Sequence, residues 1–240
     1  MSLAKRRLDL ELAQRRLVAT RSQAESYIKL GKVRVNNRLA DKPGQLVSSA
    51  DKIELTQTEQ YVSRAALKLA SVSQKLGLDF KDKVVLDVGS STGGFTDYAL
   101  QHDSQKVIAV DVGTDQLHPS LRSNQKIDLH EKTDIRDFVP AEKPDIALID
   151  VSFISLRQVL PAVAKLSNKQ TQIIAMLKPQ FEAGEKDVNK GIIKNDSIRR
   201  QILKDFELWA KEQFVIKNKA DSEVAGTKGN RERFYLLTVR

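Results

Sequence analysis

Asp87-Val88-Gly89-Ser90-Ser91-Thr92-Gly93-Gly94-Phe95 is the stretch that decides the fold of this 240-residue chain. It follows a short apolar run over residues 83–87 and opens a segment that can form a helix. Because glycine lets the backbone turn tightly and approach a ligand closely, the stretch is typical of a cofactor loop between a strand and a helix. It lacks the Gly-x-Gly-x-x-Gly pattern of dinucleotide folds and the Gly-x-x-x-x-Gly-Lys pattern of triphosphate loops.

Short apolar runs and helical segments alternate on both sides of this loop. The strand candidates are residues 83–87, 106–111, 145–149, 172–176 and 234–239. Helices are clearest at residues 61–76 and 197–213. The alternation predicts an α/β fold, an open and mainly parallel sheet with helices on both faces. In such sheets ligands bind at the carboxyl ends of the strands, where the glycine loop, Asp111, Asp150 and Lys178 all fall.

The first 56 residues differ from the rest in charge. They contain twelve Lys and Arg against six Asp and Glu, a difference of +6 out of +9 for the whole chain. Such an excess favours a polyanionic partner, nucleic acid before an acidic membrane. Since residues 56–60 are polar, we expect a linker at 57–60 between a small domain at 1–56 and a larger one at 61–240.

The same segment has the pattern of a small α+β domain. Three leucines indicate a first helix: Leu8, Leu12 and Leu17. Ser22 can cap a second helix over residues 23–30, and Gly31 can end it. Short strands are expected at residues 33–35, before an Asn-Asn turn, and at residues 53–55.

This segment resembles the S4-type RNA-binding domain, named after a ribosomal protein. The matching residues are Arg7-Leu8-Asp9, Arg21-Ser22-Gln23-Ala24, Tyr27-Ile28, Gly31-Lys32-Val33 and Val35-Asn36. The resemblance implies that the two helices and the following turn present a basic face to structured RNA. The basic residues expected on that face are Arg6, Arg7, Arg21, Lys29, Lys32 and Arg34.

The acid before the first glycine, in Asp87-Val88-Gly89, resembles the S-adenosylmethionine loop of class I methyltransferases. Asp111 stands 24 residues later, at the end of the next strand, where such enzymes bind the two ribose hydroxyls. Asp134 stands where they contact the adenine amino group. The resemblance implies S-adenosyl-L-methionine as cofactor, with a site formed by Asp87, Gly89, Ser90, Ser91, Gly93, Gly94, Phe95, Asp111 and Asp134.

Four charged residues stand in short, distinctive segments. The segments are Ser63-Arg64-Ala65-Ala66-Leu67-Lys68-Leu69, Asp150-Val151-Ser152-Phe153, Leu177-Lys178-Pro179-Gln180-Phe181-Glu182 and Gly229-Asn230-Arg231-Glu232. Together they resemble the TlyA, or hemolysin A, family of RNA 2'-O-methyltransferases, over essentially the whole chain. That family joins an S4-type domain to an FtsJ-like methyltransferase domain, which implies a Rossmann-like sheet of seven strands. Its Lys-Asp-Lys-Glu tetrad falls on Lys68, Asp150, Lys178 and Glu232.

Such a tetrad suits the deprotonation of a ribose 2'-hydroxyl, which is a poor nucleophile while it keeps its proton. A neutral lysine can act as the base, but an ordinary lysine ammonium has a pKa of about 10.4, so positive charge nearby must favour the neutral amine. We expect Lys178 to be the general base and Lys68 its electrostatic and positioning partner. The two acids would orient the lysines. The family analogy favours cytidine in ribosomal RNA or ribosomal subunits as the substrate.

The composition excludes several other chemistries. The chain has no cysteine, which rules out disulfides, thiol catalysis and cysteine-ligated zinc and fits a reducing, cytoplasmic location. Its three histidines lack the spacing of metal ligands, so no metal site is expected. The basic N-terminus has no apolar core after it, and no run approaches 18 apolar residues. We therefore expect no secretory signal, no transmembrane helix and no membrane partner.

Two alternatives stay open. A membrane-lytic protein, as the name hemolysin suggests, would need an apolar or amphipathic insertion segment. An RNA-binding protein with an inactive methyltransferase domain would not need the tetrad. Ala65-Ala66 replaces a glycine common in relatives, and residues 191–196 lack their usual Val-Arg-Asp ending, which weakens the substrate inference. The sequence does not set the nucleotide, the subunit, the choice between naked RNA and an assembled particle, or the oligomeric state.

Overall fold

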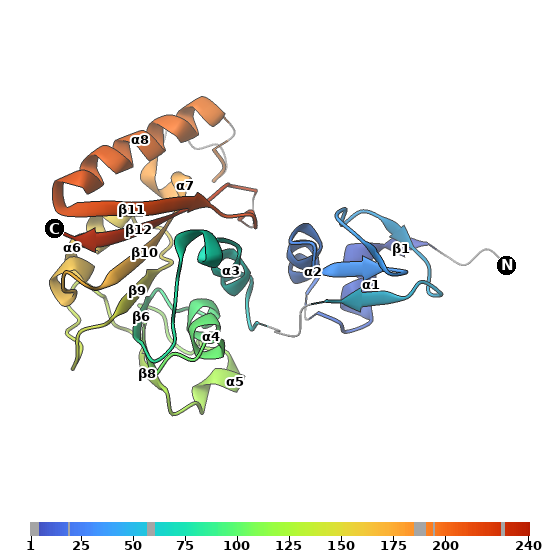
Figure 1. The fold of residues 1–240 in the computed structure, drawn as a ribbon, viewed down its shortest axis with the longest axis horizontal. Helices are drawn as coiled ribbons and strands as arrows, with labels where there is room; N and C mark the ends of the chain where they lie inside the picture. Colours follow the sequence, from blue (N-terminus) through green and yellow to red (C-terminus); the bar gives the residue numbers. More distant parts are fainter. Residues whose placement is uncertain (1–4, 19, 57–60, 185–190, 194, 227–228) are drawn as a thin grey trace.

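The computed structural model describes residues 5–18, 20–56, 61–184, 191–193, 195–226 and 229–240. Figure 1 shows a small domain, in blue, beside a larger domain whose sheet carries helices on both faces. Helix α2 (Arg21–Lys29) of the small domain contacts the start of α3 (Arg64–Leu76). The Gln23 side chain donates to the carbonyl of Tyr61 at 2.9 Å, and Arg64 Nε donates to Ser26 Oγ at 3.2 Å. The expected linker at 57–60 lies outside the described residues.

The small domain consists of two packed helices and short antiparallel strands. Strand β2 lies between β3 and β5, and β1 pairs with β4. The side chains between the helices and the strands form its core, and Leu8, Leu12, Tyr27, Ile28 and Val33 are fully buried there. The remaining elements are β1 (Arg6–Arg7), α1 (Leu8–Gln14), β2 (Val33–Val35), β3 (Arg38–Leu39), β4 (Leu46–Val47) and β5 (Ile53–Leu55).

Two helix limits in the small domain differ from the prediction. Helix α1 ends at Gln14, so Leu17 lies beyond it. Helix α2 begins at Arg21 because the hydroxyl of Thr20, not Ser22, caps it, accepting the Gln23 amide at 3.1 Å. The stop at Gly31, which has a φ of 68°, and the strands at 33–35 and 53–55 are confirmed.

The larger domain is built on a seven-stranded sheet, as expected. The strand order is β11-β12-β10-β9-β6-β7-β8, and only the pairings of β12 with β10 and β11 are antiparallel. Its strands are β6 (Val84–Val88), β7 (Lys106–Val110), β8 (Ile127–His130), β9 (Ile146–Ile149), β10 (Gln172–Leu177), β11 (Phe214–Asp221) and β12 (Arg233–Val239). Its other helices are α4 (Gly94–Gln101), α5 (Pro119–Arg122), α6 (Leu156–Leu166), α7 (Pro179–Glu182) and α8 (Asp196–Gln213).

Helices cover the two faces of this sheet with separate sets of side chains. Helices α3 and α4 pack on one face, against residues such as Val85, Leu148 and Met176. Helices α6 and α8 pack on the other face, against the alternate residues of the same strands, such as Leu86 and Ala147. Because both faces are covered, the central strands are continuous apolar runs, which is why the sequence revealed them.

The start of α3 also differs from the prediction. The helix begins at Arg64, not at Tyr61, because the Ser63 side chain accepts the Ala65 amide at 3.2 Å and caps it. Gly77, at a φ of 66°, ends the helix. The two strands that the sequence did not indicate, β8 and β11, are the edges of the sheet.

Candidate active site

The alternation of side chains along the strands explains the positions of three of the four tetrad residues. Successive side chains of a strand point to opposite faces. The α3 side of the sheet receives Ile146 and Leu148 from β9, Ile174 and Met176 from β10, and Leu236 and Phe234 from β12. Asp150, Lys178 and Glu232 each continue that alternation by one step. They therefore emerge on the side of the sheet that α3 covers, and α3 itself carries Lys68.

The four charged side chains form two ion pairs. Lys68 Nζ lies 2.7 Å from Glu232 Oε2, and Lys178 Nζ lies 2.6 Å from Asp150 Oδ1. All four are largely buried, with at most 16% of any side chain exposed. Lys178 Nζ also donates to Ser152 Oγ at 2.8 Å and lies 6.0 Å from the ring centre of Phe181.

The two pairs are close enough for their charges to interact. Burial raises the pKa of Glu232 above its ordinary value, and Lys68 opposes this shift. Asp150 raises the same pKa further, while Lys178 lowers it. The four groups therefore act as one electrostatic cluster at the carboxyl edge of the sheet.

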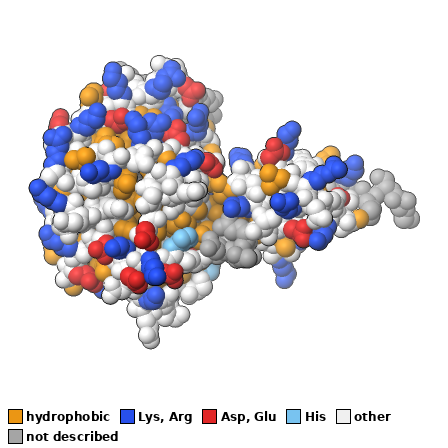
Figure 2. All heavy atoms as spheres, viewed as in Figure 1, with side chains coloured by type: hydrophobic (Ala, Val, Ile, Leu, Met, Phe, Trp, Pro, Cys, Tyr) orange, Lys and Arg blue, Asp and Glu red, His pale blue; other side chains and the backbone are white. Residues whose placement is uncertain are grey.

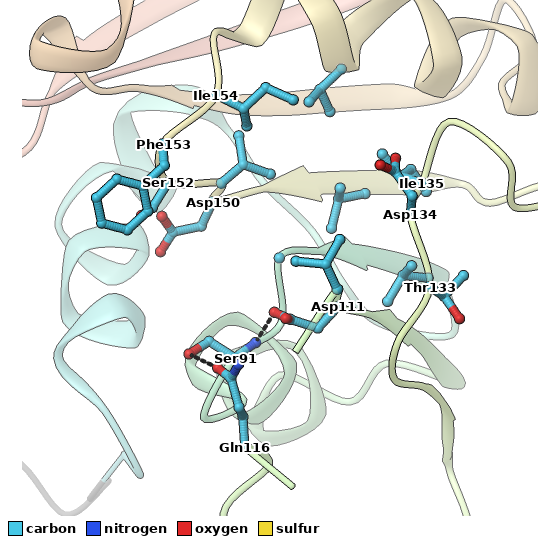
Figure 3. Close-up of a pocket in the computed structure, with 16 residues that line it drawn as sticks. Ser91, Asp111, Gln116, Thr133, Asp134, Ile135, Asp150, Ser152, Phe153 and Ile154 are labelled. Carbon is cyan, nitrogen blue, oxygen red and sulfur yellow. Dashed lines mark hydrogen bonds between the residues drawn. The ribbon is translucent and has the colours of Figure 1, made fainter. Parts of the chain in front are cut away.

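Two adjoining cavities open beside this cluster. The larger, of about 380 Å³, is lined by residues at or beyond the carboxyl ends of β6, β7, β8 and β9 (Figure 3), including Asp111, Asp134, Ser152 and Ile154. The smaller, of about 210 Å³, is lined by Asp87, the glycine loop and Lys178. Gly89, Ser91, Asp150 and Ser152 line both. The Lys68–Glu232 pair lines neither of these two cavities.

Glycines allow the loop to fit between neighbouring elements. Gly89 has a φ of 80°, and a Cβ there would lie 2.7 Å from the Asp150 carbonyl oxygen. A Cβ at Gly94 would collide with Ser63 Oγ and lie 2.8 Å from Ala65 Cβ, because α4 starts directly against α3. Gly89 and Gly94 line the cavities, whereas Gly93, with a φ of 87°, packs against the side chains of α5 and the turn before it.

Unpartnered polar atoms at the smaller cavity fit an amino-acid group such as that of S-adenosylmethionine. Asp87 Oδ1 and Ser90 Oγ are buried and have no hydrogen-bond partner among the described residues. The other carboxylate oxygen of Asp87 accepts the Thr96 hydroxyl at 2.6 Å. Burial is the main cause that raises the pKa of Asp87 to about 7. A ligand ammonium would supply the missing donors and favour the ionised carboxylate.

Asp111 and Asp134 lie in the larger cavity with part of their bonding capacity used. Asp111 accepts the amide of Ser91 at 2.8 Å (Figure 3) and the amide of Gly113 at 2.7 Å, which fixes the carboxylate beside the glycine loop. Asp134 is held by Arg136, whose closest contact is 2.6 Å. Each oxygen of Asp111 accepts one bond and keeps a lone pair, whereas the Asp134 carboxylate accepts from the backbone amide, Nε and Nη2 of Arg136. Phe95 is buried and contacts Phe234, so it shapes the floor of the smaller cavity.

The six basic residues expected to bind RNA fall into two groups. Arg7 and Arg21 both hold the fully buried Asp9, at 2.8 and 2.9 Å, and Arg6 lies 3.4 Å from Glu11. Burial alone would raise the pKa of Asp9, but hydrogen bonds from the two arginines lower it below its ordinary value. Lys29, Lys32 and Arg34 are exposed. Basic side chains also lie on the visible face of the larger domain, interspersed with acids (Figure 2).

Sequence reasoning assigned no role to two residues that the structure brings to the site. Ser152 contacts Lys178, and Glu182 binds the loop that follows Asp150. Both stand within the segments that identified the tetrad. Their contacts join positions 26 and 27 residues apart, which the spacing alone does not reveal.

Comparisons with known proteins agree with this architecture. Residues 61–239 match the model of the FtsJ-like methyltransferase family, and residues 6–53 match the S4 domain. The 23S rRNA (cytidine-2'-O)-methyltransferase TlyA of Campylobacter jejuni is 45% identical over 79% of this chain and 75% of its own. Hemolysin A of Brachyspira hyodysenteriae is 36% identical over 94% and 97%. A solved structure of a candidate hemolysin from Streptococcus thermophilus is 36% identical, with a TM-score of 0.73 over 99% and 90% of the two chains.

None of the helices in the described part of the chain has the length and apolar content that a membrane span requires. Within the same residues, no group of three or more His, Cys, Asp or Glu could hold a metal ion.

Proposed function

The chain belongs to the FtsJ-like methyltransferase family and carries an S4 domain ahead of that region, and we propose that it methylates ribose 2'-hydroxyls of ribosomal RNA. The observation that carries the proposal is the meeting of two lysine–carboxylate pairs beside a cavity lined by the glycine loop. Relatives named as rRNA (cytidine-2'-O)-methyltransferases, 37–45% identical, support ribosomal RNA as the substrate and cytidine as the nucleotide.

The proposed cofactor is S-adenosylmethionine, which supplies an electrophilic methyl group on a positively charged sulfur. Asp87 and Ser90 would hold its amino group with the oxygens that lack partners among the described residues. Asp111, already fixed by two backbone amides, would accept the ribose hydroxyls. Asp134 would meet the adenine amino group. Together the two cavities fall within the range of roughly 300–1,000 Å³ that is usual for small-molecule sites.

Lys178 is the proposed general base. Asp150 and Ser152 hold its Nζ at 2.6 and 2.8 Å, so the amine points in a fixed direction. A neutral Nζ would take the proton of the 2'-hydroxyl and leave the oxygen as the nucleophile for the methyl group that the cofactor would supply, with the cofactor's sulfur leaving as a neutral thioether. Lys68, paired with Glu232, supplies the positive charge that stabilises the developing negative charge. Alignment of the hydroxyl with the methyl group contributes the rest.

The small domain, residues 1–56, is proposed to hold the RNA for the larger domain, residues 61–240. Its exposed Lys29, Lys32 and Arg34 can contact phosphates directly. Arg7 and Arg21 are first of all part of the domain's own structure, since both bind the buried Asp9. A ribosomal substrate would place the protein in the cytoplasm.

Methyl transfer to defined RNAs tests this function. Labelled S-adenosylmethionine is offered with naked ribosomal RNA and with each ribosomal subunit, and methylated positions are mapped by their resistance to alkaline cleavage. We expect label at one or a few cytidines and none with Lys178→Ala. Label on a base, or no label on any of these substrates, would contradict the proposal.

A further inference from the structure

The proposed base and its carboxylate partner stand on two different loops. Asp150 and Ser152 belong to the loop between β9 and α6, whereas Lys178 directly follows β10. The 2.6 Å and 2.8 Å contacts of Lys178 Nζ depend on how these two loops lie relative to each other. Displacement of a catalytic group by about 1 Å can slow a reaction on the order of 100-fold. The two loops must therefore be held in a fixed position relative to each other.

Glu182 forms a buried connection between the same two loops. Its Oε1 accepts the Leu156 amide at 2.6 Å, and its Oε2 accepts the Ser155 hydroxyl at 2.6 Å. Only 2% of its side chain is exposed. Ser155 Oγ in turn accepts the Arg157 amide at 3.1 Å, so Glu182 and Ser155 together occupy the N-terminus of α6. Burial raises the pKa of Glu182 above its ordinary value, while these two hydrogen bonds, the Arg157 guanidinium and the partial positive charge of the helix N-terminus oppose that shift.

Short, stiff chain segments link these contacts to the catalytic pair. Lys178 and Glu182 are separated only by the turn of α7, in which the Phe181 amide donates to the Lys178 carbonyl at 2.9 Å. Pro179 restricts the backbone at the start of that turn. On the other loop, Ser152 stands three residues before Ser155. Phe153 and Phe181 also contact each other across the loops, with ring centres 5.1 Å apart.

We propose that Glu182 is a positioning residue that sets Lys178 in register with Asp150 and Ser152. The inference rests on the proposed role of Lys178 and goes beyond it, since Glu182 lines neither of the two cavities beside the cluster. Both of its oxygens accept from donors, one an amide and one a hydroxyl. A glutamine can still accept the Leu156 amide, but its amide nitrogen can only donate to Ser155 Oγ, so the direction of that bond is reversed. Glu182→Gln therefore replaces two charge-assisted hydrogen bonds with weaker neutral ones at nearly constant volume.

The test measures the single-turnover rate at saturating cofactor and RNA, so that weaker binding of either ligand does not change the measured rate. We expect Glu182→Gln and Ser155→Ala each to lower the rate about 10- to 100-fold, with RNA affinity unchanged. The double variant should be no slower than the slower single variant, because both changes act on the contact between Glu182 and Ser155. Glu207→Gln serves as the matched control, since Glu207 is a half-buried carboxylate that binds Lys219 and Tyr235 away from the cluster.

The outcomes separate this inference from the proposed function. Full-rate transfer by Glu182→Gln, together with an inactive Lys178→Arg, would overturn the positioning role and leave the base in place. An active Lys178→Arg would overturn the base assignment by itself. If Glu182→Gln and Glu207→Gln lose stability and rate in equal proportion, Glu182 is only structural and the inference is wrong.

Discussion

At the scale of single residues, the unusual group is Asp87, a carboxyl with no exposed surface beside the smaller cavity. Burial is the first cause of its raised pKa of about 7, and Asp150 and Asp111 raise it further against the Thr96 hydrogen bond. The folded protein thus holds this proton more tightly than the unfolded chain does. The stability that Asp87 contributes is present at low pH and is lost as the pH rises from about 4 to about 7.

Asp87 should therefore make both stability and cofactor binding depend on pH. Between pH 5 and 7, ionisation of Asp87 should lower the free energy of unfolding of the wild type by up to about 1.4 kcal/mol per pH unit. The Asp87→Asn variant should not show this decrease. Cofactor affinity should change the opposite way and increase from pH 6 to pH 8, because the ionised carboxylate binds the ammonium. Denaturant titration and calorimetry at both pH values measure these effects. Equal cofactor affinity at pH 6 and pH 8 would remove Asp87 from the site.

The resemblance of four short segments to the TlyA family indicated the tetrad residues, but not how they pair. Lys68 and Glu232 are 164 positions apart in the chain, and their contact depends on where α3 lies over the sheet. Similarly, Arg7 and Arg21 both hold the buried Asp9, a result of packing that a count of basic residues cannot show.

At the scale of elements, the packing of α3 on α4 connects the tetrad to the glycine loop. Gly94→Ala should destabilise the protein by about 1–3 kcal/mol, because its Cβ would collide with Ser63 and press on Ala65 in a filled interface. Denaturant unfolding measures the loss. Gly184→Ala is the matched control, since among the described residues no atom beyond its chain neighbours lies within 4 Å of the added Cβ, and it should stay within about 0.5 kcal/mol of wild type. Equal stability of the two variants would contradict the described packing.

The same packing explains which elements could be predicted. The central strands β6, β7, β9 and β10 are buried on both faces, so they appear in the sequence as apolar runs. The edge strands β8 and β11 carry polar residues along exposed borders, and their sequences resemble loops. The start of a helix was predicted wrongly where the sequence offers two polar residues as possible caps, as at Thr20 and Ser22.

At the scale of the whole molecule, the basic small domain stands beside the methyltransferase domain, and α2 contacts the start of α3 (Figure 1). Removing the charges of Lys29, Lys32 and Arg34 together by alanine substitution should weaken RNA binding. If all three contact phosphates, the slope of log affinity against log salt should become shallower by roughly 2–3, at 0.7–0.9 per contact. Cofactor affinity should not change. The experiment uses the full chain, because the buried side chains of the two domains form one continuous cluster.

A second triple variant controls for total charge. Lys204, Lys211 and Lys217 are exposed on α8 and β11, which lie away from the small domain (Figure 1). Their replacement by alanine removes the same charge and should leave the salt slope almost unchanged. Equal losses in the two variants would mean that RNA binding follows net charge rather than the small domain.

The central claim, that Lys178 removes the proton from the 2'-hydroxyl, is tested most directly by Lys178→Arg. Arginine keeps a positive charge beside Asp150 but stays protonated at any usable pH, so it cannot serve as the base. The measurement is single-turnover transfer of labelled methyl groups to ribosomal RNA, with cofactor and RNA affinity measured on the same preparation. We expect this variant to bind cofactor and RNA and to show no detectable methyl transfer. A Lys178→Arg enzyme that transfers methyl groups at close to the wild-type rate would contradict the central claim.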